Sequence, residues 1–92
     1  MQIIPSKTFL NDLDNISKKT ARILRDKLKI ILINPTYFKR VKGFNYDIFR
    51  IRIKDKRIVY LIRNNKIYLI CILKRKYNYQ DLKKYLHQLG YL

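Results

Sequence analysis

Apolar and polar residues alternate in three segments in the second half of the chain. The segments lie between Phe49 and Tyr79, and two polar pairs, Asp55-Lys56 and Asn64-Asn65, separate them. Alternation with a period of two is typical of half-buried strands, and each polar pair fits a two-residue hairpin loop. The pattern therefore predicts two consecutive β-hairpins.

Two-residue loops would fix which residues face each other across these hairpins. A loop at Asp55-Lys56 pairs Lys54 with Arg57 and Arg52 with Val59. Side chains alternate across a strand, so one face then carries four cations, Arg50, Arg52, Lys54 and Arg57. The other face carries apolar side chains, Phe49, Ile51, Ile53, Ile58, Tyr60 and Ile62. In the third strand, Tyr68, Ile70, Ile72 and Lys74 fall on the cationic side, and Ile67, Leu69, Cys71 and Leu73 on the apolar side. A slip of one residue in either loop would invert this assignment.

Two amphipathic helices are predicted ahead of the hairpins. Ser6 is a natural N-cap for a helix through about Ile16, and Ser17 for a second helix from Lys18 to about Leu32. Asn34-Pro35 ends the second helix, because the residue before a proline avoids helical angles. The apolar stripes of the pair suit the apolar face of the hairpins. We therefore expect an αα-hairpin on one face of the sheet, with the cationic face left open.

The two ends of the chain complete the predicted domain. Met1 to Ile4 can form a short edge strand, which Pro5 ends, and Tyr79 to Leu89 can form a terminal helix with Gly90 as its C-cap. The segment between Thr36 and Tyr46 can hold one more short strand. The sequence thus predicts a single α+β domain over residues 1–92, with a small, mainly antiparallel sheet and a short C-terminal helix.

Composition narrows the range of functions that the chain can have. The net charge is +16, and the only acids are six Asp. The positive electrostatic field of such a chain favours binding to nucleic acid, an anionic membrane surface or an acidic protein partner. The N-terminus lacks the features of a secretory signal and no apolar run is long enough to cross a bilayer, so a cytoplasmic protein is expected. No glycine-rich phosphate loop and no metal-spaced His or Cys cluster occurs, so no metal or cofactor is expected.

The predicted cationic face suits a polyanion. Like charges on neighbouring strands repel, and the only acid between Arg50 and Arg75 is Asp55, so pairing within the chain cannot neutralise them. Solvated strand residues are the alternative interpretation. A second basic cluster, with Lys39 and Lys42, precedes Gly43 and either lies in a solvated loop or follows a phosphate backbone.

The order of these residues resembles the RelE/ParE toxin superfamily, and RelE-type toxins most closely. The resemblance rests on Phe49-Arg50-Ile51-Arg52-Ile53, on Arg57-Ile58-Val59-Tyr60, and on Arg75 followed four residues later by Tyr79. It extends upstream through Ser6-Lys7-Thr8-Phe9 and Asn34-Pro35, so it covers nearly the whole chain.

The resemblance implies the toxin of a type II toxin–antitoxin system. RelE-type members are metal-independent endonucleases that cut messenger RNA in the ribosomal A site, and an acidic, RelB-like antitoxin holds them inactive. Carried over by position, Arg52, Arg57, Arg75 and Tyr79 are the candidate catalytic residues. Arg50, Lys54, Lys74, Lys39 and Lys42 are the candidate RNA-binding residues.

Some roles stay open from the sequence alone. Tyr79 is either a site residue or the first anchor of the terminal helix, and His87 is either a surface residue of that helix or a catalytic one. Arginine is a poor general base because of its high pKa, so the base is not identified. A ParE-like inhibitor of DNA gyrase and an inactive member that only binds RNA or its antitoxin are the alternative functions.

Overall fold

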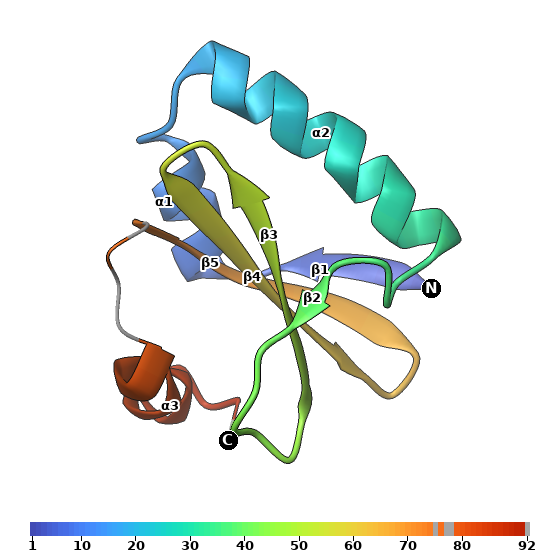
Figure 1. The fold of residues 1–92 in the computed structure, drawn as a ribbon, viewed down its shortest axis with the longest axis vertical. Coiled ribbons are helices and arrows are strands. Elements are labelled where there is room, and N and C mark those ends of the chain that lie inside the picture. Colours follow the sequence, from blue (N-terminus) through green and yellow to red (C-terminus); the bar gives the residue numbers. More distant parts are fainter. Residues whose placement is uncertain (75, 77–78, 92) are drawn as a thin grey trace.

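The structure, a computed structural model, describes residues 1–74, 76 and 79–91 (Figure 1). Of Tyr79, Gln80 and Asp81 it describes the backbone alone. The elements in chain order are β1 (Gln2–Pro5), α1 (Lys7–Leu13), α2 (Lys18–Ile33), β2 (Lys39–Arg40), β3 (Asp47–Ile53), β4 (Lys56–Arg63), β5 (Lys66–Lys74) and α3 (Tyr79–Gln88). The predicted α+β class, with an N-terminal αα-hairpin and a short C-terminal helix, is confirmed.

The five strands form one sheet in the order β1-β5-β4-β3-β2. The two hairpins make β3, β4 and β5 antiparallel neighbours, β2 pairs antiparallel with β3, and β1 pairs parallel with β5. Beyond the end of β1, two side chains form hydrogen bonds with the main chain of β5. The Ser6 hydroxyl donates to the Ile70 carbonyl at 2.6 Å, and the Asp12 carboxylate accepts from the Ile72 N–H at 2.9 Å.

The first hairpin turns one residue earlier than predicted. Its loop is Lys54-Asp55, so Arg52 faces Arg57 and Ile53 faces Lys56. The loop still has two residues, and moving it by one position therefore changes the pairing by two residues and leaves each side chain on its predicted face. Lys54 adopts a φ of 54°, in the left-handed region that the turn requires.

The second loop is Asn64-Asn65 as predicted, with φ of 52° and 60°, as in a type I′ turn. Farther along β5 the pairing slips by one residue between Val59 and Tyr60, and Ile70 is the extra residue. A β-bulge of this kind reverses the faces of everything beyond it. The predicted faces are therefore wrong for Cys71, Ile72, Leu73 and Lys74.

Helices α1 and α2 cover the apolar face, as expected. The hydroxyls of Ser6 and Ser17 accept from the N–H of Phe9 and Thr20, and so cap the two helices. Helix α1 ends at Leu13, three residues earlier than predicted, and Asn34 is the C-cap of α2. The core on this side, which we call the first core, consists of Phe9, Leu24, Ile31, Phe49, Ile51, Ile53, Ile58, Tyr60, Ile67 and Leu69.

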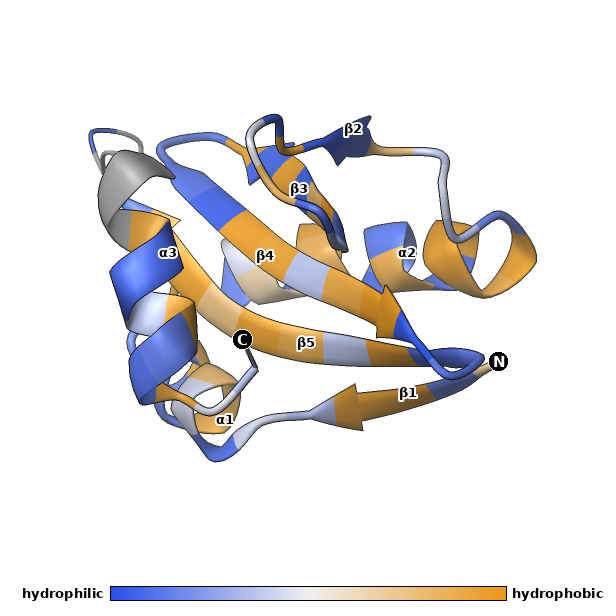
Figure 2. Ribbon diagram, turned by 90° about the horizontal axis from the view of Figure 1, so that it is seen from below, coloured by the Kyte–Doolittle hydropathy of each residue, from blue (hydrophilic) through white to orange (hydrophobic). Residues whose placement is uncertain are grey.

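The expectation of an open cationic face is wrong in part, because α3, whose place in the fold is seen in Figure 1, packs against this face. Leu82 and Leu86 of α3 pack on the sheet in the second core, which consists of Val41, Ile48, Val59, Leu61, Ile70, Cys71, Leu73, Leu82 and Leu86. Figure 2 shows β4 and β5 as largely hydrophobic, β2 as hydrophilic and much of the α3 ribbon as hydrophilic. Gly90, with a φ of 84°, ends α3 as predicted, and the N–H of Tyr91 donates to the carbonyl of Leu86.

Candidate nucleic-acid interface

Arg52 and Arg57 face each other across β3 and β4 on the side of the sheet that α3 partly covers. Arg57 is only 6% exposed, whereas Arg52 is exposed. The Arg57 guanidinium donates to the carbonyl of Lys56 through Nη1 at 3.2 Å. Burial of this arginine in a central strand limits its motion, so it can present its charge from a fixed position.

Arg50 lies one alternate position along β3, on the same face as Arg52. It is half-buried, and Lys39 of β2 faces it across the edge of the sheet. A hollow of about 300 Å³ lies here and is lined by Lys39, Arg40, Val41, Lys42 and Arg50. The fold therefore joins the basic cluster around Lys39 and Lys42 to the arginines of β3. Phosphate is the ligand chemistry that such a cationic hollow favours.

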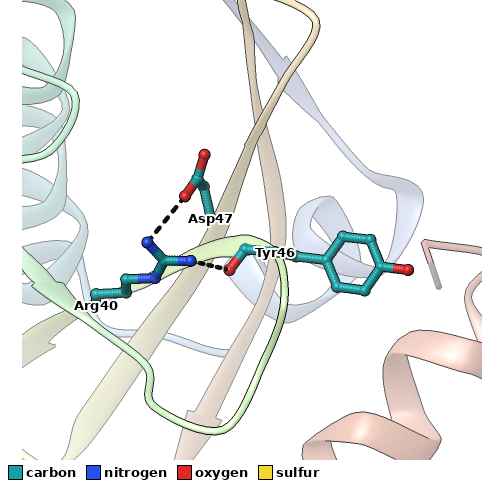
Figure 3. A network of polar contacts seen from close by, with 3 residues as sticks. All are labelled: Arg40, Tyr46 and Asp47. Atoms are coloured by element: carbon teal, nitrogen blue, oxygen red, sulfur yellow. Dashed lines mark hydrogen bonds and ion pairs between the residues drawn. The ribbon is translucent and has the colours of Figure 1, made fainter.

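The loop beside this hollow is held by Arg40. Its guanidinium makes an ion pair of 3.1 Å with Asp47 and donates to the carbonyl of Tyr46 at 3.1 Å (Figure 3). The Tyr46 ring also lies 5.4 Å from the guanidinium carbon of Arg63, which donates to the carbonyl of Tyr91 at 2.6 Å. These contacts tie the loop before β3 to the C-terminal segment. Both flank the cationic side of the sheet.

The remaining predicted site residues have different positions. Lys54 lies in the exposed turn next to Arg52. Lys74 lies on the α1 side instead of beside the arginines, because the bulge reverses its face, and Leu73 takes the place next to Arg57. Arg75 lies outside the described residues, as does the side chain of Tyr79, whose backbone begins α3. His87 is exposed on α3.

One basic residue of the sheet was missed by the sequence analysis. The sequence pattern predicts Lys56 in a turn, but it is the first residue of β4 and faces Lys74. Lys56 continues the alternation of Ile58 and Tyr60 by two residues toward the N-terminus. A predicted loop at Asp55-Lys56 excludes it from the strand. An earlier turn would have revealed it.

A buried thiol and a buried phenol lie on opposite sides of the sheet. Burial, and then the charge of Asp12, raises the pKa of the Cys71 thiol from 9.0 to about 12. Burial also raises the pKa of Tyr60, whose hydroxyl donates to the carbonyl of Pro35 at 2.7 Å. Cys71 is therefore protonated at neutral pH and is a packing residue rather than a nucleophile.

Metal ligands, membrane spans and a further groove were also sought in the part of the chain that the structure describes. There, no group of three or more His, Cys, Asp or Glu residues could hold a metal ion. No described helix combines the length and hydropathy needed to span a membrane. A groove of about 410 Å³ lies between α1 and α2, and its lining combines apolar side chains with three cations, Lys18, Arg22 and Arg25.

A family of toxins matches most of the chain. The family described as "ParE toxin of type II toxin-antitoxin system, parDE" matches residues 3–79. None of the curated protein sequences matches this chain.

Solved structures of RelE toxins share the fold. The RelE chain of the intact E. coli RelBE toxin–antitoxin complex aligns with a TM-score of 0.73 at 17% identity, over 83% of this chain and 98% of that chain. Isolated E. coli RelE aligns with a TM-score of 0.73 at 15% identity, over 96% of this chain and 97% of that chain. A chain of the RelB-RelE complex from Methanococcus jannaschii aligns with a TM-score of 0.66 at 20% identity, over 79% of this chain and 91% of that chain.

Proposed function

We propose that this chain, which belongs to the ParE toxin family of type II toxin–antitoxin systems, is a metal-independent endonuclease that cuts messenger RNA. It shares its fold with RelE toxins, and an RNA-cutting activity is our extension of that likeness. The observation that carries the proposal is the facing pair Arg52 and Arg57, with Arg50 on the same face beside a cationic hollow.

RNA brings its own nucleophile to such a site. The 2′-hydroxyl attacks the adjacent phosphorus and the bond to the 5′-oxygen of the next nucleotide breaks, which leaves a cyclic phosphate and a 5′-hydroxyl end. The 2′-hydroxyl gives up its proton, and the leaving oxygen gains one. The protein needs to align these atoms and to stabilise the extra negative charge of the phosphorane. Guanidinium groups suit that task because they bind phosphate oxygens in pairs.

The positions support a division of roles. Arg57, held in the central strand, would stabilise the scissile phosphate, and the exposed Arg52 would contact it or its neighbour. Arg50, Lys39 and Lys42, around the hollow, would bind flanking phosphates, and Lys54 would bind one at the turn. By resemblance, Arg75 would assist Arg57, and Tyr79 would stack on a base or assist proton transfer.

An acidic antitoxin is the proposed protein partner. Structural neighbours of this chain include complexes of RelE with RelB, and a net charge of +16 favours an acidic ligand. We propose that the cognate antitoxin covers the cationic face and blocks RNA. The ribosomal A site, in the cytoplasm, is the proposed place of action.

The test compares Arg57→Gln with Arg22→Gln, which removes the same charge from an exposed position on α2. Cleavage of messenger RNA by Arg57→Gln should fall by roughly 10²–10³, the cost of removing one group that stabilises transition-state charge. Arg22→Gln should cleave like wild type. Melting curves show whether both variants fold. Undiminished cleavage by a folded Arg57→Gln variant would contradict the proposal.

A second candidate function follows from the description of the matched family, which is that of ParE toxins. A ParE-like protein would inhibit DNA gyrase without cutting RNA. Induced expression should then cause DNA damage while messages remain intact, whereas the nuclease should arrest translation with cleaved messages. A toxin fold that only binds RNA or its antitoxin would produce neither result.

A further inference from the structure

Lys56 and Lys74 form a facing pair of cations at the end of the sheet, on the side opposite the arginines. The register places them directly across from each other, where like charges destabilise a sheet. In the part of the chain that is described, no ion pair involves either lysine. Asp12 lies beside the two lysines, but its carboxylate already accepts from the N–H of Ile72 at 2.9 Å.

A hollow of about 380 Å³ separates these lysines from α1. Its lining consists of Asp12, Asn15, Ile16, Lys56, Ile72 and Lys74. Two ammonium groups against one carboxylate leave the hollow positive. Lys56 is half-buried, so part of its side chain is already fixed against the protein and the entropy cost is smaller when its ammonium binds an anion.

The lysine pair is next to the arginine pair along the strands. Arg52 and Arg57 occupy one row of the ladder, and Ile53, Lys56 and Lys74 occupy the following row. Successive rows lie about 3.3 Å apart and point to opposite faces. The end of the sheet thus carries arginines on one face, lysines on the other and the exposed Lys54 in the turn between β3 and β4.

We infer that single-stranded RNA bound on the arginine face continues over the end of the sheet and places a backbone phosphate between Lys56 and Lys74. This inference rests on the proposed function and extends it with a second phosphate site on the α1 face. The β-bulge is what makes the site, because without the extra residue Lys74 would point to the other face. The end of the sheet then contacts the RNA backbone on both of its faces.

The experiment measures how binding of a 2′-O-methylated, uncleavable RNA depends on salt. The double variant Lys56→Gln with Lys74→Gln is compared with Lys19→Gln and Lys29→Gln, which removes two charges from exposed positions of α2. The slope of log affinity against log salt should fall by about 0.7 for each phosphate that the protein no longer neutralises. It should fall in the first variant and stay at the wild-type value in the second. An oligonucleotide trimmed to cover the arginine face alone should bind both variants like wild type.

Each other outcome overturns the inference in a recognisable way. If both double variants bind the long RNA with the wild-type slope, while Arg50→Gln weakens binding, the RNA does not cross the sheet end and the proposed function stands. If the wild-type slope is flat, both proposals fail. If the lysine variant binds the co-purified antitoxin more weakly and RNA as before, the site serves the antitoxin. A melting temperature no lower than that of wild type confirms that the variant folds.

Discussion

The two faces of the sheet are built differently. The first core, under α1 and α2, is apolar, and helix α2 has 16 residues with which to cover it. The opposite face divides into the second core, under the 10-residue α3, and a cationic part that contains Arg50 and Arg52. The arginines of β3 thus share their face with the shorter helix.

This difference places the first core on one face and the arginines that the proposed function uses on the other. Burial of apolar area in the first core stabilises the fold without using a polar surface. On the other face, Leu82 and Leu86 anchor α3 to the sheet, and Arg50 and Arg52 lie outside the second core. Truncations on the two faces should therefore have different consequences.

The largest effect is expected from core truncation. Ile51→Ala in the first core and Leu86→Ala in the second core each remove a fully buried side chain, and each should cost about 2–5 kcal/mol in the free energy of unfolding. Urea denaturation measures this cost. Hydrogen exchange should distinguish the faces, because Leu86→Ala should speed exchange mainly in α3 and Ile51→Ala throughout the sheet. Equal protection of α3 in both variants would contradict the separation of the two cores.

A smaller effect is expected where α1 meets β5. Asp12→Ala leaves the part-buried N–H of Ile72 without its carboxylate acceptor and should destabilise the protein by about 1.5–3 kcal/mol. Asp14→Ala is the control, since Asp14 is exposed at the end of α1 and should change stability by less than about 0.5 kcal/mol. Thermal unfolding of both variants measures the difference. Equal melting temperatures would show that this hydrogen bond adds nothing.

The pH dependence of stability should reveal one buried group on each face. The folded pKa of Cys71 lies at about 12, above its ordinary 9.0, and that of Tyr60 is also raised. Unfolded chains therefore give up these protons first, so stability should fall as pH rises above about 9. Cys71→Ala and Tyr60→Phe should each flatten this fall when urea denaturation is repeated from about pH 8 to 11, values chosen to bracket the ordinary thiol and phenol pKa values. An unchanged slope in both variants would exclude these groups as its source.

The smallest effect concerns the turn at the cationic end. Lys54 has a φ of 54°, which strains a side chain other than glycine. Lys54→Gly should relieve that strain and raise stability by roughly 0.5–1 kcal/mol, while it weakens RNA binding. Asn65→Gly, in the other hairpin, is the control that changes a left-handed residue without removing a charge. Equal RNA binding by the two variants would remove Lys54 from the interface.

Local patterns in the sequence were sufficient for most of the elements. Ser6, Ser17, Asn34 and Gly90 marked helix ends correctly, because capping depends on residues close together in the chain. Alternation placed Arg50, Arg52 and Arg57 on one face, and that placement survived the shift of the first turn. The signal of a second core was also present, since Ile48, Val59 and Leu61 share the arginine face. The roles proposed for Arg75 and Tyr79 stay predictions.

By itself, the sequence determined the helices, the two hairpins and the separation of an apolar from a cationic face, because these follow from periods of a few residues. Tertiary structure decided the faces of Cys71 to Lys74. The bulge that sets them is held by Ser6 and Asp12, which lie 64 and 60 residues from their partners on β5. No local pattern contains such a contact, since it forms only when the N-terminal segment packs along the last strand. That packing moves Lys74 next to Lys56.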